Sequence, residues 1–176
     1  DDHIHENDYL LEETGEAGTS ITLCPEDVTL FWKRLRKNTG QKFRYYACGE
    51  YGDNTARPHY HAIVFGLDIP DLKLYKKTSL GFNLYTSETI SRTWKNGYVI
   101  ISESSWETCA YTARYVMKKR KGITADFYKR YNMVPEFVRM SRRPGIGMEY
   151  YNEHRDDIYE TDELIFSTKK GGMKTR

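Results

Sequence analysis

The stretch from Phe43 to Gly66, FRYYACGEYGDNTARPHYHAIVFG, decides the fold. Its first part, Phe43–Tyr51, is rich in aromatic side chains, and His59–Phe65 carries a second run of aromatic and β-branched residues. Both compositions are typical of strands. The segment between them, Gly52–Pro58, contains Gly, Asp, Asn and Pro, which favour turns. We therefore predict an antiparallel β-hairpin.

This hairpin brings histidines and a carboxylate together. His59 and His61 are two residues apart, so in a strand both side chains point to the same face. With the turn centred in the connecting segment, Glu50 pairs with His59, and directly paired Cβ atoms lie about 5 Å apart. Two imidazoles and a carboxylate would suit Mg²⁺ or Mn²⁺. Two plain surface histidines remain the alternative, and Tyr60, on the opposite face, is expected to pack.

Helical patterns flank the hairpin. Pro25 and two acids suit a first turn, apolar residues follow at helical spacing, and Gly40 ends the helix. The order of elements predicts an α+β domain whose central antiparallel sheet is flanked by helices. The further elements expected are a charged connection (Pro70–Asn83), a short helix (Ser87–Trp94), a strand (Gly97–Ile101), helices (Ser105–Lys121 and Thr124–Tyr131), an Arg/Pro/Gly-rich loop (Ser141–Gly147) and an acidic helix (Met148–Tyr159).

The helix expected over Ser105–Lys121 carries two tyrosines on one face. Tyr111 and Tyr115 are four residues apart, and Lys118 lies three further on, along the same side. A phenol has a pKa near 10 and is a poor nucleophile at neutral pH. A metal or a lysine beside it favours the phenolate and makes it competent. An amphipathic helix with aromatic core residues, and a lysine that only contacts phosphate, is the alternative interpretation.

Charge is segregated along the chain, although the net charge is only +2. Residues 1–32 contain nine acidic residues and no lysine or arginine. Residues 112–143 contain ten basic and two acidic residues, a local charge of +8. Such a basic block is typical of surfaces that meet phosphates. A solvated, helix-rich surface is the alternative.

Three cysteines, Cys24, Cys48 and Cys109, are widely spaced and form no CxxC pattern. The spacing disfavours a structural zinc site and is typical of reduced thiols in a cytosolic protein. No apolar run is long enough to span a bilayer, so we expect no membrane partner. The chain begins without methionine and ends in a Lys/Gly-rich stretch, so both ends look cut from a longer protein.

Two motifs carry a family resemblance. Gly49-Glu50-Tyr51-Gly52 with Arg57-Pro58-His59-Tyr60-His61-Ala62-Ile63-Val64-Phe65-Gly66 resembles the histidine motif of HUH rolling-circle replication initiators. The stretch Tyr111-Thr112-Ala113-Arg114-Tyr115-Val116-Met117-Lys118-Lys119 resembles their two-tyrosine motif. The flanks, including Ser141–Gly147, are most similar to the initiators of small single-stranded-DNA phages of the Microviridae type. The resemblance extends over about Thr22 to Tyr159.

The resemblance implies a DNA-nicking and strand-rejoining enzyme. A metal, Mg²⁺ or Mn²⁺ on His59, His61 and Glu50, would bind the scissile phosphate, and Tyr111 or Tyr115 would attack it. The products would be a 5′-phosphotyrosine link and a free 3′-OH, with Lys118 positioning the phosphate. Backbone contacts to single-stranded DNA would come from Arg114, Lys119, Arg142 and Arg143.

The same resemblance implies partners and a place of action. These are single-stranded DNA or a phage replication origin, and the host replication helicase and polymerase, in the cytoplasm of a bacterial host cell. Members of the family carry an upstream strand motif, which this chain is expected to lack. We assign residues 1–20 to an acidic loop or mobile N-terminal segment, 21–160 to the HUH domain and 161–176 to a truncated tail.

Two further interpretations of the same residues remain open. A related HUH transposase or relaxase uses similar chemistry, although the paired tyrosines and phage-like flanks favour replication initiation. A non-catalytic module could also bind single-stranded nucleic acid through the basic block alone. Beyond these, a plain structural domain would contain the HxH pattern by chance, and steep salt dependence of DNA binding would count against it.

Overall fold

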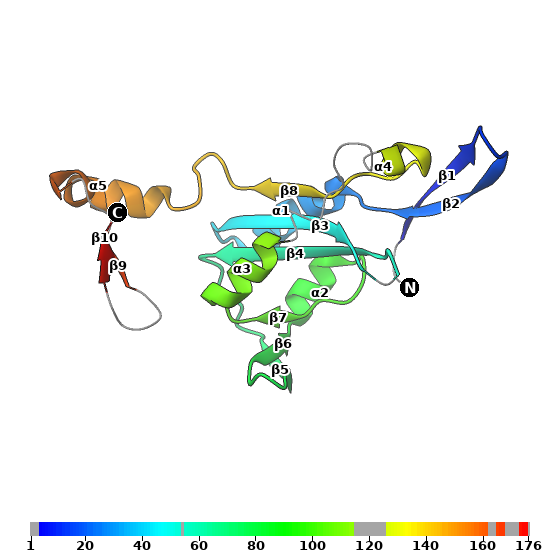
Figure 1. The fold of residues 1–176 in the computed structure, drawn as a ribbon. Coiled ribbons are helices and arrows are strands. Elements are labelled where there is room, and N and C mark those ends of the chain that lie inside the picture. The colour runs from blue at the N-terminus through cyan, green and yellow to red at the C-terminus, as the bar shows by residue number, and fades with distance from the viewer. Residues whose placement is uncertain (1–3, 54, 115–125, 162–164, 168–172, 176) are drawn as a thin grey trace. The chain divides into compact units, whose positions relative to one another are not determined.

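The computed structural model describes residues 4–53, 55–114, 126–161, 165–167 and 173–175 (Figure 1). The chain divides into two compact units, Asp1–Met140 and Ser141–Arg176. In the first unit the helices are α1 (Pro25–Thr39), α2 (Glu88–Trp94), α3 (Trp106–Arg114) and α4 (Asp126–Arg130). The strands of this unit are β1 (His5–Leu11), β2 (Glu16–Thr22), β3 (Arg44–Tyr51), β4 (Pro58–Phe65), β5 (Lys73–Lys77), β6 (Asn83–Thr86), β7 (Ile101–Ser102) and β8 (Phe137–Met140).

A three-stranded antiparallel sheet in the order β4-β3-β8 forms the centre of the first unit. The hairpin β3–β4 runs in unbroken register from the pair Arg44↔Phe65 to the pair Tyr51↔Pro58. With helices packed against this sheet, the predicted α+β class with antiparallel pairing is confirmed. Because side chains alternate along a strand, the sheet has two faces of different character.

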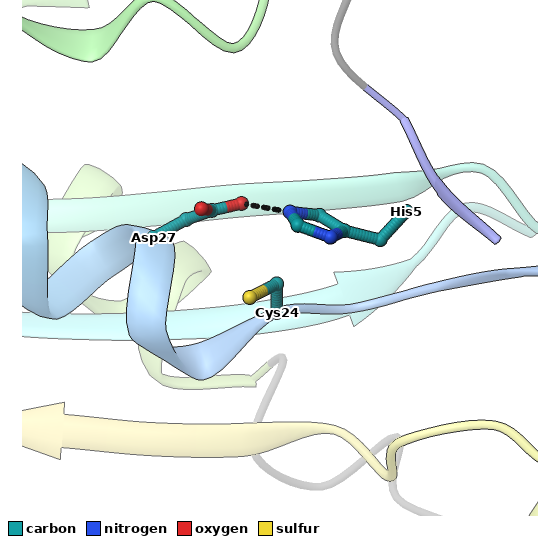
Figure 2. A group of neighbouring side chains, drawn as sticks. All are labelled: His5, Cys24 and Asp27. Atoms are coloured by element: carbon teal, nitrogen blue, oxygen red, sulfur yellow. Dashed lines mark hydrogen bonds and ion pairs between the residues drawn. The ribbon is translucent and has the colours of Figure 1, made fainter. Parts of the chain in front are cut away.

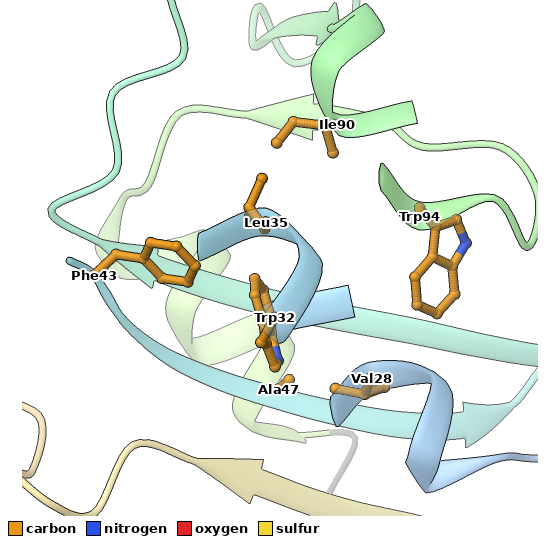
Figure 3. Packing of buried hydrophobic residues seen from close by; sticks show 7 residues of the cluster. All are labelled: Val28, Trp32, Leu35, Phe43, Ala47, Ile90 and Trp94. Atoms are coloured by element: carbon orange, nitrogen blue, oxygen red, sulfur yellow. The ribbon is translucent and has the colours of Figure 1, made fainter. Parts of the chain in front are cut away.

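One face of the sheet carries the hydrophobic core (Figure 3). Trp32 of α1 stacks on Tyr45 of β3 at 4.4 Å between ring centroids. Ala47, the next residue on that face, is also buried in the cluster, and α2 adds Ile90 and Trp94. The buried members of the cluster are Val28, Trp32, Leu35, Phe43, Ala47, Ile90 and Trp94.

Local signals explain where α1 begins and ends. Pro25 stands at the start of the helix, where its missing N–H costs no hydrogen bond. Glu26 and Asp27 occupy the first turn and favour the positive end of the helix dipole. At the other end Gly40 has φ +67° and donates its N–H to the carbonyl of Arg36 at 2.9 Å. Glycine adopts this left-handed conformation without a steric penalty.

Helix α3 packs against the opposite face of β3 and β4, as Figure 1 shows. The thiol of Cys48 on β3 donates to the backbone carbonyl of Thr112 at a sulfur–oxygen distance of 3.8 Å. Cys48 and Ala47 are adjacent in β3 and therefore point to opposite faces. The sheet is thus covered by α1 on one side and by α3 on the other.

The N-terminal segment corrects one prediction. Residues 1–20 were expected as a loop or mobile segment, but β1 and β2 form an antiparallel hairpin. Alternate residues of β1 are half-buried: the Tyr9 ring lies 5.1 Å from that of Tyr131, and the Asn7 amide donates to the Asn132 carbonyl at 2.7 Å. Because acidic residues take the exposed alternate positions, composition hid a strand with period two.

Other differences concern short strands. The expected charged connection Pro70–Asn83 contains β5, which pairs with β6, and the expected strand Gly97–Ile101 is reduced to β7. No pattern in the sequence predicted β8. The helix expected over Ser105–Lys121 is described as far as Arg114, where α3 ends, and residues 115–125 lie outside the described part.

The second unit contains α5 (Met148–Thr161) and the antiparallel pair β9 (Ile165–Ser167) and β10 (Met173–Thr175). The acidic helix predicted over Met148–Tyr159 is confirmed by α5. The unit boundary after Met140 differs from the boundary at residue 160 assigned from the sequence. Among all described residues, no helix combines the length and the apolar character needed to cross a membrane.

Candidate functional site

The hairpin β3–β4 places a carboxylate and two histidines in neighbouring register positions. Glu50 pairs with His59, as predicted, and Cys48 pairs with His61. Nε2 of His61 lies 3.0 Å from Oε1 of Glu50, so the two side chains meet diagonally across the pair of strands. Since Cys48 reaches α3 from the same face, the Glu50–His61 contact lies on the side of the sheet that α3 covers.

Burial distinguishes the two partners of this contact. The side chain of Glu50 is 6% exposed, whereas that of His61 is 28% exposed. A buried carboxylate is costly without a polar or charged partner, and the imidazole supplies one. The partly exposed imidazole leaves the contact open to solvent on one side. The pair therefore resembles a polar site that a ligand can reach.

Cys48 is a residue of this site that the sequence analysis did not identify. Burial raises the pKa of its thiol to about 11, helped by the nearby charge of Glu50 and opposed by a hydrogen bond from the backbone of His61. The same hairpin register that predicted Glu50 opposite His59 also puts Cys48 opposite His61. That register was the available signal. At neutral pH this thiol is a neutral packing group.

His59 is exposed and stands apart from the Glu50–His61 contact. Its ring lies over the turn, because a Cβ built on Gly52 would come within 2.9 Å of the His59 Cε1 atom. Within the described ranges, the set of three metal-ligating side chains with donor atoms within 4.8 Å of one another is a different one, His5, Cys24 and Asp27.

The predicted metal ligands nevertheless fit a hard divalent cation in their chemistry. Glu50 and His61 already lie within ligand-to-ligand distance of each other. His59 occupies the correct register position, and rotation of its exposed side chain away from Gly52 would bring its ring nitrogen toward the pair. Imidazole and carboxylate ligands suit Mn²⁺, and carboxylate with water suits Mg²⁺.

Helix α3 carries the described part of the two-tyrosine motif. Tyr111 precedes Thr112, which is 8% exposed and touches the sheet through its carbonyl. Arg114 ends the helix and is exposed. Three residues assigned from the sequence, Tyr115, Lys118 and Lys119, lie outside the described residues.

The remaining basic residues assigned to DNA belong to the second unit. Arg142 and Arg143 are exposed, in a turn closed by a bridge between Arg142 and Gly145. Both guanidinium groups are therefore available to an anionic partner.

Tyr60 confirms the expectation that the residue between the histidines packs. Its ring meets Trp94 edge-to-face at 5.1 Å, and its hydroxyl accepts the backbone N–H of Cys24 at 2.9 Å. Burial raises the pKa of Tyr60 to about 12. The hydroxyl therefore stays protonated and acts as a structural link between β4 and the start of α1.

Comparison with known proteins places these residues in a family. Residues 13–120 match the family model of the replication-associated protein ORF2. This region contains β3, β4 and α3, and with them the Glu50–His61 contact and Tyr111. No solved structure matches the chain.

Several curated relatives are similar over most of the chain. Identity is 40% over 151 residues with the replication-associated protein ORF2 of Spiroplasma virus 4, covering 84% of this chain and 46% of the relative. It is 37% over 157 residues with the replication-associated protein VP4 of Bdellovibrio phage phiMH2K, covering 83% and 48%. It is 36% over 179 residues with the replication-associated protein ORF4 of Chlamydia phage 1, covering 96% and 42%. The chain thus spans about half the length of these relatives.

Proposed function

Because the chain belongs to the family of the replication-associated protein ORF2, we propose that it nicks and rejoins DNA to initiate rolling-circle replication of a single-stranded-DNA phage. The proposed reaction is the HUH type, in which a tyrosine attacks a phosphodiester beside a metal ion. The similar proteins of Bdellovibrio and Chlamydia phages support a phage origin for the substrate. The chain would then act in the cytoplasm of the bacterial host.

One observation carries the proposal. The hairpin register brings the buried Glu50 carboxylate within 3.0 Å of the His61 imidazole, on the sheet face against which α3 packs. That helix contains Tyr111. A polar, partly open pair and a helix bearing a potential nucleophile thus come from opposite sides of one interface.

In the proposed reaction the phenol oxygen of Tyr111 or Tyr115 bonds to the scissile phosphorus, and the phosphorus–O3′ bond breaks. The phenol loses its proton, the departing 3′ oxygen gains one, and the strand is held as a 5′-phosphotyrosine. Glu50, His61 and His59 would hold Mg²⁺ or Mn²⁺, which supplies charge neutralisation at the phosphate when bound. Attack of a 3′-OH on the phosphotyrosine reverses the step without ATP.

The basic residues would hold the strand. Arg114 is exposed at the end of the helix that carries Tyr111, so a guanidinium there suits the phosphate next to the reacting one. Arg142, Arg143 and Lys119 are proposed as further backbone contacts, and Lys118 as a group that positions the phosphate. The free 3′-OH would be extended by the host polymerase with the host helicase.

Covalent capture of DNA tests the proposal. The protein is incubated with single-stranded oligonucleotides of random sequence and Mg²⁺ or Mn²⁺, resolved on a denaturing gel, and the attached DNA is sequenced. We expect a covalent adduct that requires the metal and maps to Tyr111 or Tyr115. The double variant Tyr111→Phe/Tyr115→Phe should lose the adduct while retaining DNA binding, because phenylalanine keeps the ring and removes the nucleophile.

Tyr98→Phe serves as the matched control, since this tyrosine is 72% exposed and lies outside α3. It should form as much adduct as the wild type. An adduct that persists in the double variant would refute the tyrosine mechanism. Binding without any adduct, from wild type and variants alike, would instead support the non-catalytic DNA-binding module.

A further inference from the structure

The start of α1 contains a cluster of side chains that the proposed nicking reaction does not use. His5, Cys24 and Asp27 each offer one donor atom, and these atoms all lie within 4.8 Å of one another (Figure 2). The closest pair is Nε2 of His5 and Oδ2 of Asp27, at 2.8 Å. The three side chains come from sequence positions that show no metal-binding spacing.

The fold holds each member of the cluster in place. His5 pairs with Thr22 across the hairpin β1–β2, which sets it beside the residues that lead into α1. Cys24 is the residue before the helix, and its carbonyl accepts the N–H of Asp27 at 3.2 Å. The backbone N–H of Cys24 is bound in turn by the hydroxyl of Tyr60. The cluster is therefore anchored from the hairpin, from the helix start and from β4.

Imidazole nitrogen, thiolate sulfur and carboxylate oxygen are the ligands that proteins offer to Zn²⁺. Around a tetrahedral Zn²⁺ such donor atoms lie roughly 3.5 Å apart, so the observed cluster needs adjustments of about an ångström. With one thiolate and one carboxylate, the site would be electrically neutral once the ion is bound. A sulfur ligand also selects against Mg²⁺ and Mn²⁺.

The cluster is reachable from solvent yet partly enclosed. The side chain of His5 is 32% exposed and that of Asp27 is 13% exposed. A bound ion would thus have protein on one side and room for a water molecule as fourth ligand on the other. Without a bound ion, the same atoms form the hydrogen-bonded His5–Asp27 pair beside the thiol of Cys24.

We propose that His5, Cys24 and Asp27 form a Zn²⁺ site that ties the N-terminal hairpin to the start of α1. The ion would link β1 to the helix on which the core is built. This site is separate from the proposed Mg²⁺ or Mn²⁺ ligands, because the two sets share no residue and differ in donor chemistry.

Cobalt substitution tests the site directly. Chain freed of metal with a chelator is titrated with Co²⁺ and followed by absorption spectroscopy. We expect one Co²⁺ per chain with a thiolate-to-cobalt charge-transfer band in the near ultraviolet, displaced by one equivalent of Zn²⁺. Cys24→Ser should abolish that band, because it removes the sulfur ligand.

Cys109→Ser is the matched control, since Cys109 is also half-buried and free of any disulfide. It should keep the band. His5→Gln leaves the thiol in place and gives a second measurement: the band should persist, with the Co²⁺ dissociation constant raised at least tenfold. Circular dichroism of each variant reports whether it folds.

The proposal is overturned if the wild type shows no charge-transfer band, if the band survives in Cys24→Ser, or if His5→Gln binds Co²⁺ as tightly as the wild type. The last comparison decides the matter even if Cys24→Ser fails to fold. None of these measurements involves DNA, so their outcome is independent of the nicking reaction.

Discussion

At the scale of single residues, Glu50 is the group on which the candidate site depends. It is buried in β3 and meets the one imidazole, His61, that lies diagonally across the hairpin. Register arithmetic from the sequence was sufficient to predict its position opposite His59, because both residues belong to one local hairpin. The His5, Cys24 and Asp27 cluster could not be predicted in this way, since it requires the pairing of β1 with β2 and the docking of that hairpin on α1.

Replacing Glu50 by glutamine tests its role as a ligand. Glutamine keeps the shape and removes the charge, so we expect metal-stimulated DNA attachment to fall on the order of 10²-fold. The decrease should be relieved in part by raising the Mn²⁺ concentration, because the defect lies in metal affinity. Attachment is measured as the initial rate of adduct formation against metal concentration.

His154→Gln supplies the control for that experiment, because His154 is an exposed histidine of α5 that pairs with Asp157. Its rate should match the wild type. If Glu50→Gln kept the wild-type rate and metal dependence, Glu50 would not be a ligand.

Cys48 gives a residue-scale prediction about pH. Burial and the charge of Glu50 raise the pKa of its thiol from 9.0 to about 11. The fold therefore favours the neutral thiol, and this contribution to stability is complete below about pH 9 and is lost as the pH rises through about 11. A shift of about two units lowers the thiolate fraction at pH 8 roughly 100-fold.

Alkylation should accordingly reach Cys48 last. In native protein at pH 8, iodoacetamide should label Cys24 and Cys109, both half-buried, before Cys48. In denaturant the three rates should converge. Peptide mass spectrometry measures each rate, and equal native rates would contradict the buried environment described for Cys48.

At the scale of elements, the long and strongly patterned segments were predicted and the short ones were not. The hairpin β3–β4 and helix α1 carry clear signals in composition, spacing and termini. Strand β8 has four residues, too few for a periodic pattern. Its position depends on tertiary contacts of the preceding residues: the Tyr51 hydroxyl donates to the Val134 carbonyl at 2.7 Å, and the Val134 N–H donates to Thr22 at 2.8 Å.

The packing between β3 and β8 can be tested at Gly49. A Cβ at this position would lie 2.6 Å from the Phe137 ring and 2.9 Å from Leu23. We expect Gly49→Ala to destabilise the fold by about 1–3 kcal/mol, because the neighbours are themselves packed and must move. Urea denaturation followed by tryptophan fluorescence measures the loss.

Gly145→Ala is the comparison variant, since a Cβ there meets no atom within 4 Å. Its free energy of unfolding should stay within about 0.5 kcal/mol of the wild-type value. Equal values for the two variants would mean that the Gly49 contact is not a tight one.

At the scale of the whole molecule, charge is distributed so that the net value hides the distribution. The chain carries 27 basic and 25 acidic residues, yet the basic excess is concentrated after residue 111. A near-neutral protein of this kind should still bind single-stranded DNA with a strong dependence on salt. The sequence alone was sufficient for this inference, because it rests on order along the chain and on no tertiary contact.

Arg114→Gln measures one part of that dependence. If the guanidinium contacts a phosphate, the slope of log affinity against log salt should become shallower by about 0.7, the value for one phosphate on a single strand. Fluorescence anisotropy with a labelled oligonucleotide gives the slope. Arg92→Gln is the control, because Arg92 lies on α2 and is ion-paired with Glu88; an equal change in both variants would rule out a specific contact by Arg114.

The alternation of side chains along β3 has a consequence for insertions and deletions. Ala47 and Gly49 face the core, whereas Cys48 and Glu50 face α3. Adding or removing one residue inside the strand would exchange these faces, moving the carboxylate into the core and the core residues toward α3. Length changes are therefore tolerated in the turn at 52–57, which leaves both faces intact, and inside the strands they remove the fold and the site together.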